Sequence, residues 1–147
     1  MATPAPTSRS REAPQGDEEA ASELRLGEFQ NADTLTHSEA ALVINALVTK
    51  RKADRKNVNE TEILQKTTQY LEHFARFRKK ENVEAVERLL SAKDNKLAKF
   101  ERAQLGSLCC DTAEEAKTLI PSLQDKISDE ELQELLDDIT KLMGYGN

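Results

Sequence analysis

Residues 128–142 read SDEELQELLDDITKL, and this stretch predicts an amphipathic helix. Its apolar side chains recur at intervals of three and four residues, so they fall on one face of a helix. Ser128 and Glu131 have the spacing of a capping box, in which each side chain accepts a hydrogen bond from the other residue's backbone N–H. Gly144 is placed to end this helix. The apolar residues are Leu132, Leu135, Leu136, Ile139 and Leu142.

The same start signal occurs at three earlier places in the chain. Capping-box spacings begin at Thr36, Asn59 and Asp111, each with a Glu three residues later. Helical periods also fit residues 81–93 and 96–108, and Pro121 ends the short helix that follows Asp111. The sequence therefore predicts an all-α domain of about six helices. Aromatic residues make up only 4% of the chain and Trp is absent, so aliphatic side chains must form most of the core.

The strongest helical period follows Asn59. Apolar and aromatic side chains recur there at helical spacing, which predicts that this helix supplies the aromatic centre of the core. The stripe consists of Ile63, Thr67, Tyr70, Leu71, Phe74 and Phe77.

The N-terminal part of the chain has a different composition. Residues 1–20 contain three of the four prolines and little that is apolar, which predicts a disordered tail. Residues 21–35 alternate weakly between apolar and polar side chains and predict a weak strand or extended arm that ends near Gly27. A lone strand has no partner for its backbone groups. The arm is therefore either a loop or a strand that joins the sheet of another protein. Residues 36–147 form the predicted helical domain.

Charge argues against a protein whose main task is to bind nucleic acid. The net charge is −6 and the pI about 5.1, whereas phosphate-binding domains are usually basic. Two basic clusters are the candidates for such contact, and both occur where a predicted helix ends. Solvated helix ends that favour the helix dipole are the preferred interpretation. The candidate residues are Lys50, Arg51, Lys52, Arg78 and Lys79.

No set of residues in the sequence indicates catalysis, a cofactor or a metal. His37 lies within a capping box and His73 lies beside Glu72, without convergent ligands. The adjacent Cys109 and Cys110 are followed by acidic residues, which do not activate a thiol. No apolar run approaches a membrane span, and the N-terminus lacks the apolar core of a secretory signal. We expect a non-enzymatic interaction protein of a reducing, intracellular compartment, without a small-molecule substrate.

Several stretches resemble a known family more closely than composition alone would require. They are KFERAQLGSLC at 99–109, TAEEAKTLIPSL at 112–123 and DEELQELLDDI at 129–139, together with 67–77 and 24–29. These stretches resemble the family of subunit four of eukaryotic RNA polymerase II, over roughly residues 22–143.

That resemblance implies a fold type, a partner and a cellular role, which helical periodicity does not indicate. It implies an HRDC-like helical domain over roughly residues 60–144, and a heterodimer with RNA polymerase II subunit seven that forms the stalk of the enzyme. The implied protein is nuclear, with a further cytoplasmic fraction, and acts in transcription initiation and later transcript handling, while the active site lies in other subunits. The predicted contacts with subunit seven are Leu24, Leu26, Phe29, Leu35, Val43 and Leu47.

Two alternatives remain open at this point. One is a free-standing helical module that binds nucleic acid, as HRDC-type domains do in some helicases; it would need a continuous basic face. The equivalent stalk subunit of RNA polymerase III would share the fold, although the stretches at 100–109 and 112–123 fit the polymerase II subunit better.

Overall fold

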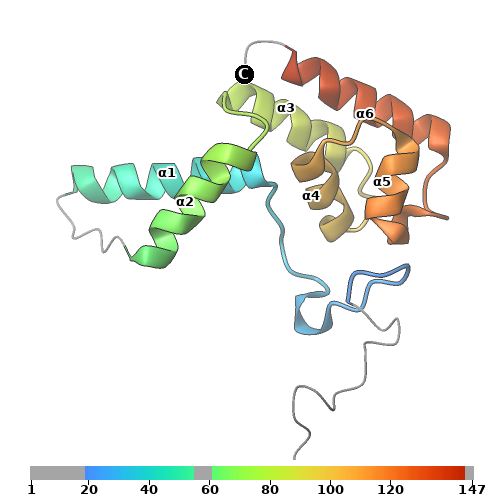
Figure 1. The fold of residues 1–147 in the computed structure, drawn as a ribbon, viewed down its shortest axis with the longest axis horizontal. Helices are drawn as coiled ribbons and strands as arrows, with labels where there is room; N and C mark the ends of the chain where they lie inside the picture. The colour runs from blue at the N-terminus through green and yellow to red at the C-terminus, as the bar shows by residue number, and fades with distance from the viewer. Residues whose placement is uncertain (1–18, 55–60, 145–147) are drawn as a thin grey trace, which may run out of the picture.

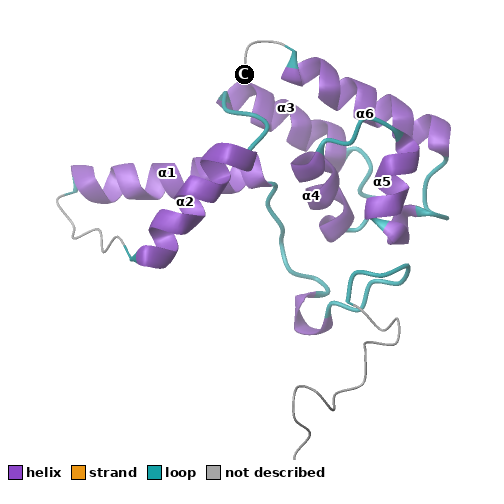
Figure 2. Ribbon diagram, in the orientation of Figure 1, coloured by secondary structure: helices purple, strands orange, loops and turns teal. Residues whose placement is uncertain are grey.

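The structure is a computed structural model that describes residues 19–54 and 61–144. These residues form six α-helices and two short 3-10 turns, and no strand is present among them (Figures 1 and 2). The all-α prediction is therefore confirmed. No helix in the described ranges is long and apolar enough to cross a membrane. The elements are η1 (Gly27–Phe29), α1 (His37–Ala53), α2 (Glu62–Phe74), α3 (Lys80–Ser91), α4 (Lys99–Leu108), α5 (Ala113–Leu119), η2 (Pro121–Leu123) and α6 (Asp129–Met143).

Side-chain caps fix the start of four helices. Thr36 and Glu39 form the predicted capping box at α1, with bonds of 3.2 and 3.0 Å, and the Ser128 hydroxyl accepts from the backbone N–H of Glu131 at α6. The other two predicted caps are wrong by one or two residues. The cap of α2 is Thr61 rather than Asn59, which lies outside the described residues, and the cap of α5 is Thr112 rather than Asp111.

Helices α3 to α6 form the body of the molecule around one apolar core. Helix α3 packs chiefly on α6, while α5 packs on α6 and α4 packs on α3 (Figure 1). The predicted inward face of α6 is correct, because four of its five apolar residues are buried and Leu142 is partly buried. The shorter observed helices α3 and α4 leave residues 92–98 as turns, in place of the predicted helix ends.

Helices α1 and α2 form a hairpin that projects from one side of the body (Figure 1). Two hydrogen bonds secure its base. The backbone N–H of His37 donates to the Ser107 hydroxyl of α4 at 3.0 Å, and the N–H of Phe77 donates to the buried Ser38 hydroxyl at 3.0 Å. Gly106 allows a close approach here, since an added Cβ would lie 2.5 Å from the Thr36 methyl.

The predicted aromatic centre of the core is wrong. Helix α2 ends at Phe74, and only Leu71 of its residues is buried. Tyr70 and Phe74 are exposed, as is Ile63 at 78%. Phe77 is buried in the body core, but it lies in the link after α2 rather than on the helix. The stripe packs on one helix only, so part of it stays uncovered.

In the chain by itself, the described part of the arm has no strand, while its pairing with another protein's sheet stays a prediction. Ala20 and Leu24 make one isolated bridge, and residues Gly27–Phe29 form a 3-10 turn that Gly27 enters with a φ of +59°. A left-handed φ favours glycine, so this residue sets the turn. From here the chain runs along one side of the body to the start of α1 (Figure 1). The predicted disordered tail falls mostly outside the described residues.

Candidate partner interface

Exposed apolar side chains lie on both helices of the hairpin. Val43 and Leu47 are one turn apart on α1 and are 45% and 53% exposed. On α2, Tyr70 and Phe74 are also one turn apart and are exposed by 49% and 53%. Large apolar side chains that cluster in this way on a soluble domain mark an interaction surface.

One ring contact joins the aromatic side chains of α2 to the start of α1. The rings of Tyr70 and Phe74 lie 4.7 Å apart, and Tyr70 meets the His37 ring of α1 edge-on at 5.4 Å. With 3.6 residues per turn, Val43 and Leu47 lie on the side of α1 away from Asn45, which lines the gap to α2. We call the exposed apolar side chains of the two hairpin helices the apolar flank; they are Val43, Leu47, Ile63, Tyr70 and Phe74.

The arm residues of the predicted interface gather at a second place. Leu24 and Leu26 are half-buried and Phe29 is 67% exposed. All three line a mainly apolar cavity of about 350 Å³, together with Ala98 and Phe100 at the start of α4. The arm thus rests on its own body and still presents apolar side chains to solvent.

Two contacts hold the arm against α4. The Thr34 hydroxyl donates to the backbone carbonyl of Lys99 at 3.0 Å, and the Lys99 ammonium lies 2.6 Å from the Asp33 carboxylate. The hydrogen bond and the charge of Lys99 lower the pKa of Asp33. Leu35, which is 52% exposed, follows in the stretch that joins the arm to α1. The structure therefore divides the predicted interface residues between the arm and α1, with Leu35 between them.

The two basic clusters do not merge into one face. Lys50, Arg51 and Lys52 are exposed at the far end of α1, which has 17 residues and so measures about 25 Å. Arg78 and Lys79 are also exposed. They lie near the first turn of α1, since the backbone N–H of the preceding Phe77 donates to the Ser38 hydroxyl. A continuous basic face is absent from the described part of the hairpin.

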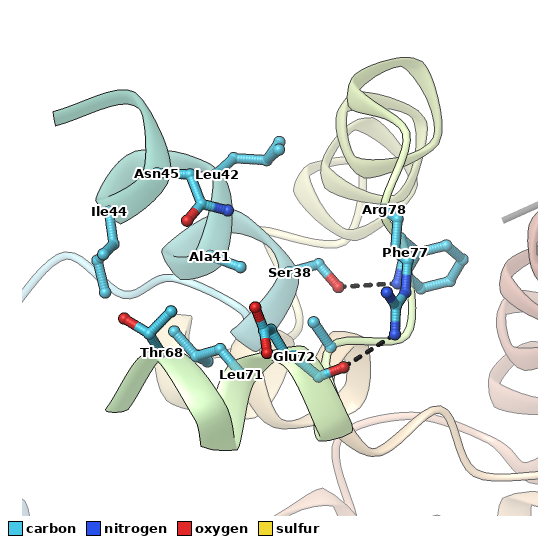
Figure 3. A pocket seen from close by; sticks show the side chains of 11 residues that line it. Ser38, Ala41, Leu42, Ile44, Asn45, Thr68, Leu71, Glu72, Phe77 and Arg78 are labelled. Carbon is cyan, nitrogen blue, oxygen red and sulfur yellow. Dashed lines mark hydrogen bonds between the residues drawn. The ribbon is translucent and has the colours of Figure 1, made fainter. Parts of the chain in front are cut away.

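Two gaps lie between α1 and α2: one of about 460 Å³, lined by residues such as Lys52 and Gln65, and a smaller one nearer the body. Figure 3 shows the smaller cavity, which has a volume of about 240 Å³, below the several hundred Å³ of common ligand pockets. The Ser38 hydroxyl accepts from Phe77 N–H on one side, and the Arg78 guanidinium donates to the Glu72 backbone carbonyl at 2.9 Å (Figure 3). These bonds join parts of the chain and leave no converging set of acid, base and nucleophile.

The residues considered for chemistry are separate from one another. Among the described residues, no three His, Cys, Asp or Glu side chains gather as metal ligands. Burial raises the pKa of the Cys109 thiol to about 11, so its reactive thiolate is disfavoured at neutral pH. His37 and His73 contact aromatic rings of α2.

Comparison with known proteins identifies the family. Residues 34–143, three quarters of the chain, match the profile of the family described as RNA polymerase Rpb4. The chain belongs to the RNA polymerase Rpb4 family. This confirms the family prediction, and the match includes the hairpin and the whole body.

Individual members of the Rpb4 family are similar over different lengths. DNA-directed RNA polymerase II subunit rpb4 of Schizosaccharomyces pombe is 47% identical over 130 residues, which cover 87% of this chain and 94% of that protein. DNA-directed RNA polymerase II subunit 4 of Arabidopsis thaliana is 32% identical over 130 residues, or 84% and 93% of the two chains. The RPB4 subunit of Saccharomyces cerevisiae is 58% identical over 79 residues, which are 54% of this chain and 35% of the yeast protein.

Residue patterns alone missed the α2 part of the apolar flank. The signal was present, because α2 carries two apolar rows: Leu64 and Leu71 on one side, and Ile63, Tyr70 and Phe74 beside them. One neighbouring helix covers one such row. The second row therefore indicated a surface that the rest of the chain leaves exposed.

Proposed function

We propose that this chain is a non-catalytic subunit of DNA-directed RNA polymerase II that pairs with subunit seven to form the stalk of the enzyme. In this proposal it acts in the nucleus, in transcription initiation and in later handling of the transcript, while other subunits carry the active site. Membership of the Rpb4 family and the names of its relatives support the polymerase assignment. The polymerase II names of these relatives favour that enzyme over polymerase III.

The observation that carries the pairing is the apolar flank. About half of the surface of most of these side chains is not covered by the rest of the chain. Burying that apolar surface in a partner is favourable by about 25 cal/mol for each Å². Tyrosine and other large side chains near the centre of an interface often dominate its binding energy. We therefore add Tyr70 and Phe74 to the predicted contacts with subunit seven.

The arm supplies the second part of the proposed interface. Leu24, Leu26 and Phe29 surround a cavity against α4 that has room for an apolar side chain of the partner. The backbone of residues 30–35 lies outside any helix, so part of it is available to a partner's strand. In this arrangement subunit seven would contact both the hairpin and the arm.

The first experiment is co-expression with subunit seven, followed by size-exclusion chromatography with light scattering. We expect a one-to-one complex. Val43→Asp with Leu47→Asp should weaken it at least about 30-fold, since burying two carboxylates in an apolar contact is unfavourable. Leu119→Asp is the matched control, because Leu119 is 52% exposed but lies on α5, away from the flank.

The arm is tested separately by Leu24→Asp with Leu26→Asp. This double variant should abolish pairing while the circular dichroism of the helices stays unchanged. Native affinity in this variant would show that the arm is not an anchor. If the unaltered chain remains a monomer in the presence of subunit seven, the pairing proposal itself is wrong.

A further inference from the structure

A polar cavity of about 240 Å³ lies where the arm, the start of α1, the end of α3 and α4 meet. Arg102 of α4 is half-buried and lines this cavity. Its Nε is the one buried side-chain nitrogen or oxygen in the described part of the chain that lacks a hydrogen-bond partner. Buried polar groups without partners are rare in folded proteins, so a buried N–H without an acceptor needs an explanation.

The cavity contains acidic side chains, but each is already engaged elsewhere. Asp33 accepts from the Lys99 ammonium at 2.6 Å. Glu39 accepts from the backbone N–H of Thr36 at 3.0 Å, and Glu87 accepts from a serine hydroxyl of α3 at 2.5 Å. Within the described residues, no carboxylate lies within ion-pair distance of Arg102.

Charge decides which acceptor fits. The cavity is lined by three carboxylates and two cations, so its own charge is already −1. A phosphate would bring up to two further negative charges against these carboxylates, whereas a carboxylate brings only one. A planar guanidinium also pairs well with a carboxylate through two parallel hydrogen bonds. Of these two anions, a single carboxylate is therefore the better acceptor for Arg102.

The position of the cavity indicates where that carboxylate comes from. Asp33 and Thr34 of the arm form one of its walls, and the exposed Leu35 follows directly. A protein that covers Leu35 therefore lies next to Thr34 and Thr36, which line the cavity. We propose that Arg102 receives an aspartate or glutamate side chain of subunit seven, an inference that rests on the pairing proposed above.

The test measures how fast the complex dissociates, by exchange of a fluorescently labelled chain for an unlabelled one. Arg102→Leu should raise the dissociation rate at least about tenfold, because it removes a charge-assisted pair. Arg102→Lys should have a smaller effect, since the charge remains but the paired geometry is lost. Arg88→Leu is the control, because Arg88 is exposed on α3 outside this cavity.

A second measurement separates this role from a structural one. Arg102→Leu also removes the unpartnered buried N–H, so the isolated variant should melt at the same temperature as the unaltered chain or higher. A lower melting temperature together with an unchanged dissociation rate would assign Arg102 to folding and overturn the proposal.

The Nε–H resonance of Arg102 identifies the source of the carboxylate. In the complex it should shift downfield and exchange more slowly with water than in the isolated chain. An Nε–H resonance that is the same in the isolated chain and in the complex would mean that no carboxylate of the partner reaches Arg102, which overturns the proposal. This inference fails while the pairing stands if a complex forms, the Nε–H resonance does not change on binding, and Arg102→Leu leaves the dissociation rate unchanged.

Discussion

At the scale of single residues, Gly106 controls how closely the hairpin approaches the body. A Cβ at this position would lie 2.5 Å from the Thr36 methyl and 2.9 Å from a Leu90 methyl, distances at which a neighbour must move. The Thr36 side chain cannot rotate freely, because its hydroxyl caps α1. The geometry of the cap and the space at Gly106 therefore depend on each other.

We predict that Gly106→Ala lowers the free energy of unfolding by about 1–2 kcal/mol, measured by urea denaturation. The overlap costs about 1–3 kcal/mol, and the better helix propensity of Ala offsets part of it. Adding Thr36→Ser should restore part of the loss, because Ser keeps the cap and lacks the methyl. Gly144→Ala is the control, since its Cβ would meet nothing closer than 3.5 Å. Equal stability of all variants would contradict this reading.

Glu131 links the start of α6 to the turn after α3. Its carboxylate lies 2.8 Å from the Lys93 ammonium and 2.5 Å from that of Lys96. These hydrogen bonds lower the pKa of Glu131 from its usual 4.5 to about 2. A lowered pKa in the folded state means that the stabilisation is complete above pH 4.5 and is lost as the pH falls toward 2.

Because the pKa of Glu131 is lowered in the folded state, we predict that its contribution to stability is lost in acid. The melting temperature of the unaltered chain should exceed that of Glu131→Gln at pH 6, and the difference should shrink steadily between pH 4.5 and pH 2. Glu130→Gln, an exposed neighbour in the same helical turn, is the control and should show a much smaller change. A difference that does not vary with pH would rule out the ion pairs as its cause.

At the scale of elements, a buried carboxylate joins α4 to the turn after α5. Glu101 has no exposed surface and accepts hydrogen bonds from the Ser122 hydroxyl, from the Lys126 ammonium at 2.8 Å and from the backbone N–H of Ala98 at 2.8 Å. The last of these also caps α4, for which the sequence offered no Ser, Thr, Asp or Asn at the cap position. One side chain thus completes a helix start and fixes the position of η2.

We expect Glu101→Ala to lower the free energy of unfolding by about 3 kcal/mol, because it leaves the buried Ser122 hydroxyl and the half-buried Ala98 N–H without their acceptor and removes the ion pair with Lys126. Lys126→Met should cost less, since the Ser122 and Ala98 bonds remain. Chemical denaturation monitored by circular dichroism measures both. A loss below about 1 kcal/mol in Glu101→Ala would show that water replaces the carboxylate.

At the scale of the whole molecule, the chain consists of a packed body and a less supported hairpin. Helices α3 to α6 share the apolar core, whereas α2 packs chiefly on α1 and buries only Leu71. Segments with few buried apolar contacts open at low free energy. The surface proposed to bind subunit seven therefore lies on the part of the chain that a partner would stabilise most.

Hydrogen exchange with mass spectrometry tests this division. In the isolated chain, amides of α2 should exchange at least about tenfold faster than amides of α6, and in the complex with subunit seven they should become protected. Amides of α6 serve as the internal reference, because four of its apolar residues are fully or almost fully buried. Uniform protection in the isolated chain would mean that the hairpin is as stable as the body.

The sequence alone determined the helices, the face of α6 that packs inward and the family. Capping residues and apolar periods are local signals, so they locate helices without knowledge of the fold, although two caps differed by one or two residues. The same signals indicated an apolar row on α2 but assigned it to the core. A period shows which residues share a face, and it does not show whether the same chain or a partner covers that face.

Only the tertiary structure decided which apolar and charged groups are buried. It placed Phe77 in the core and left Tyr70 and Phe74 exposed, although all three belong to one period in the sequence. It also buried Glu101 with partners that are 21 and 25 residues distant, and left Arg102 beside it without one. Burial depends on how distant segments pack around a residue, and that arrangement is a property of the whole fold.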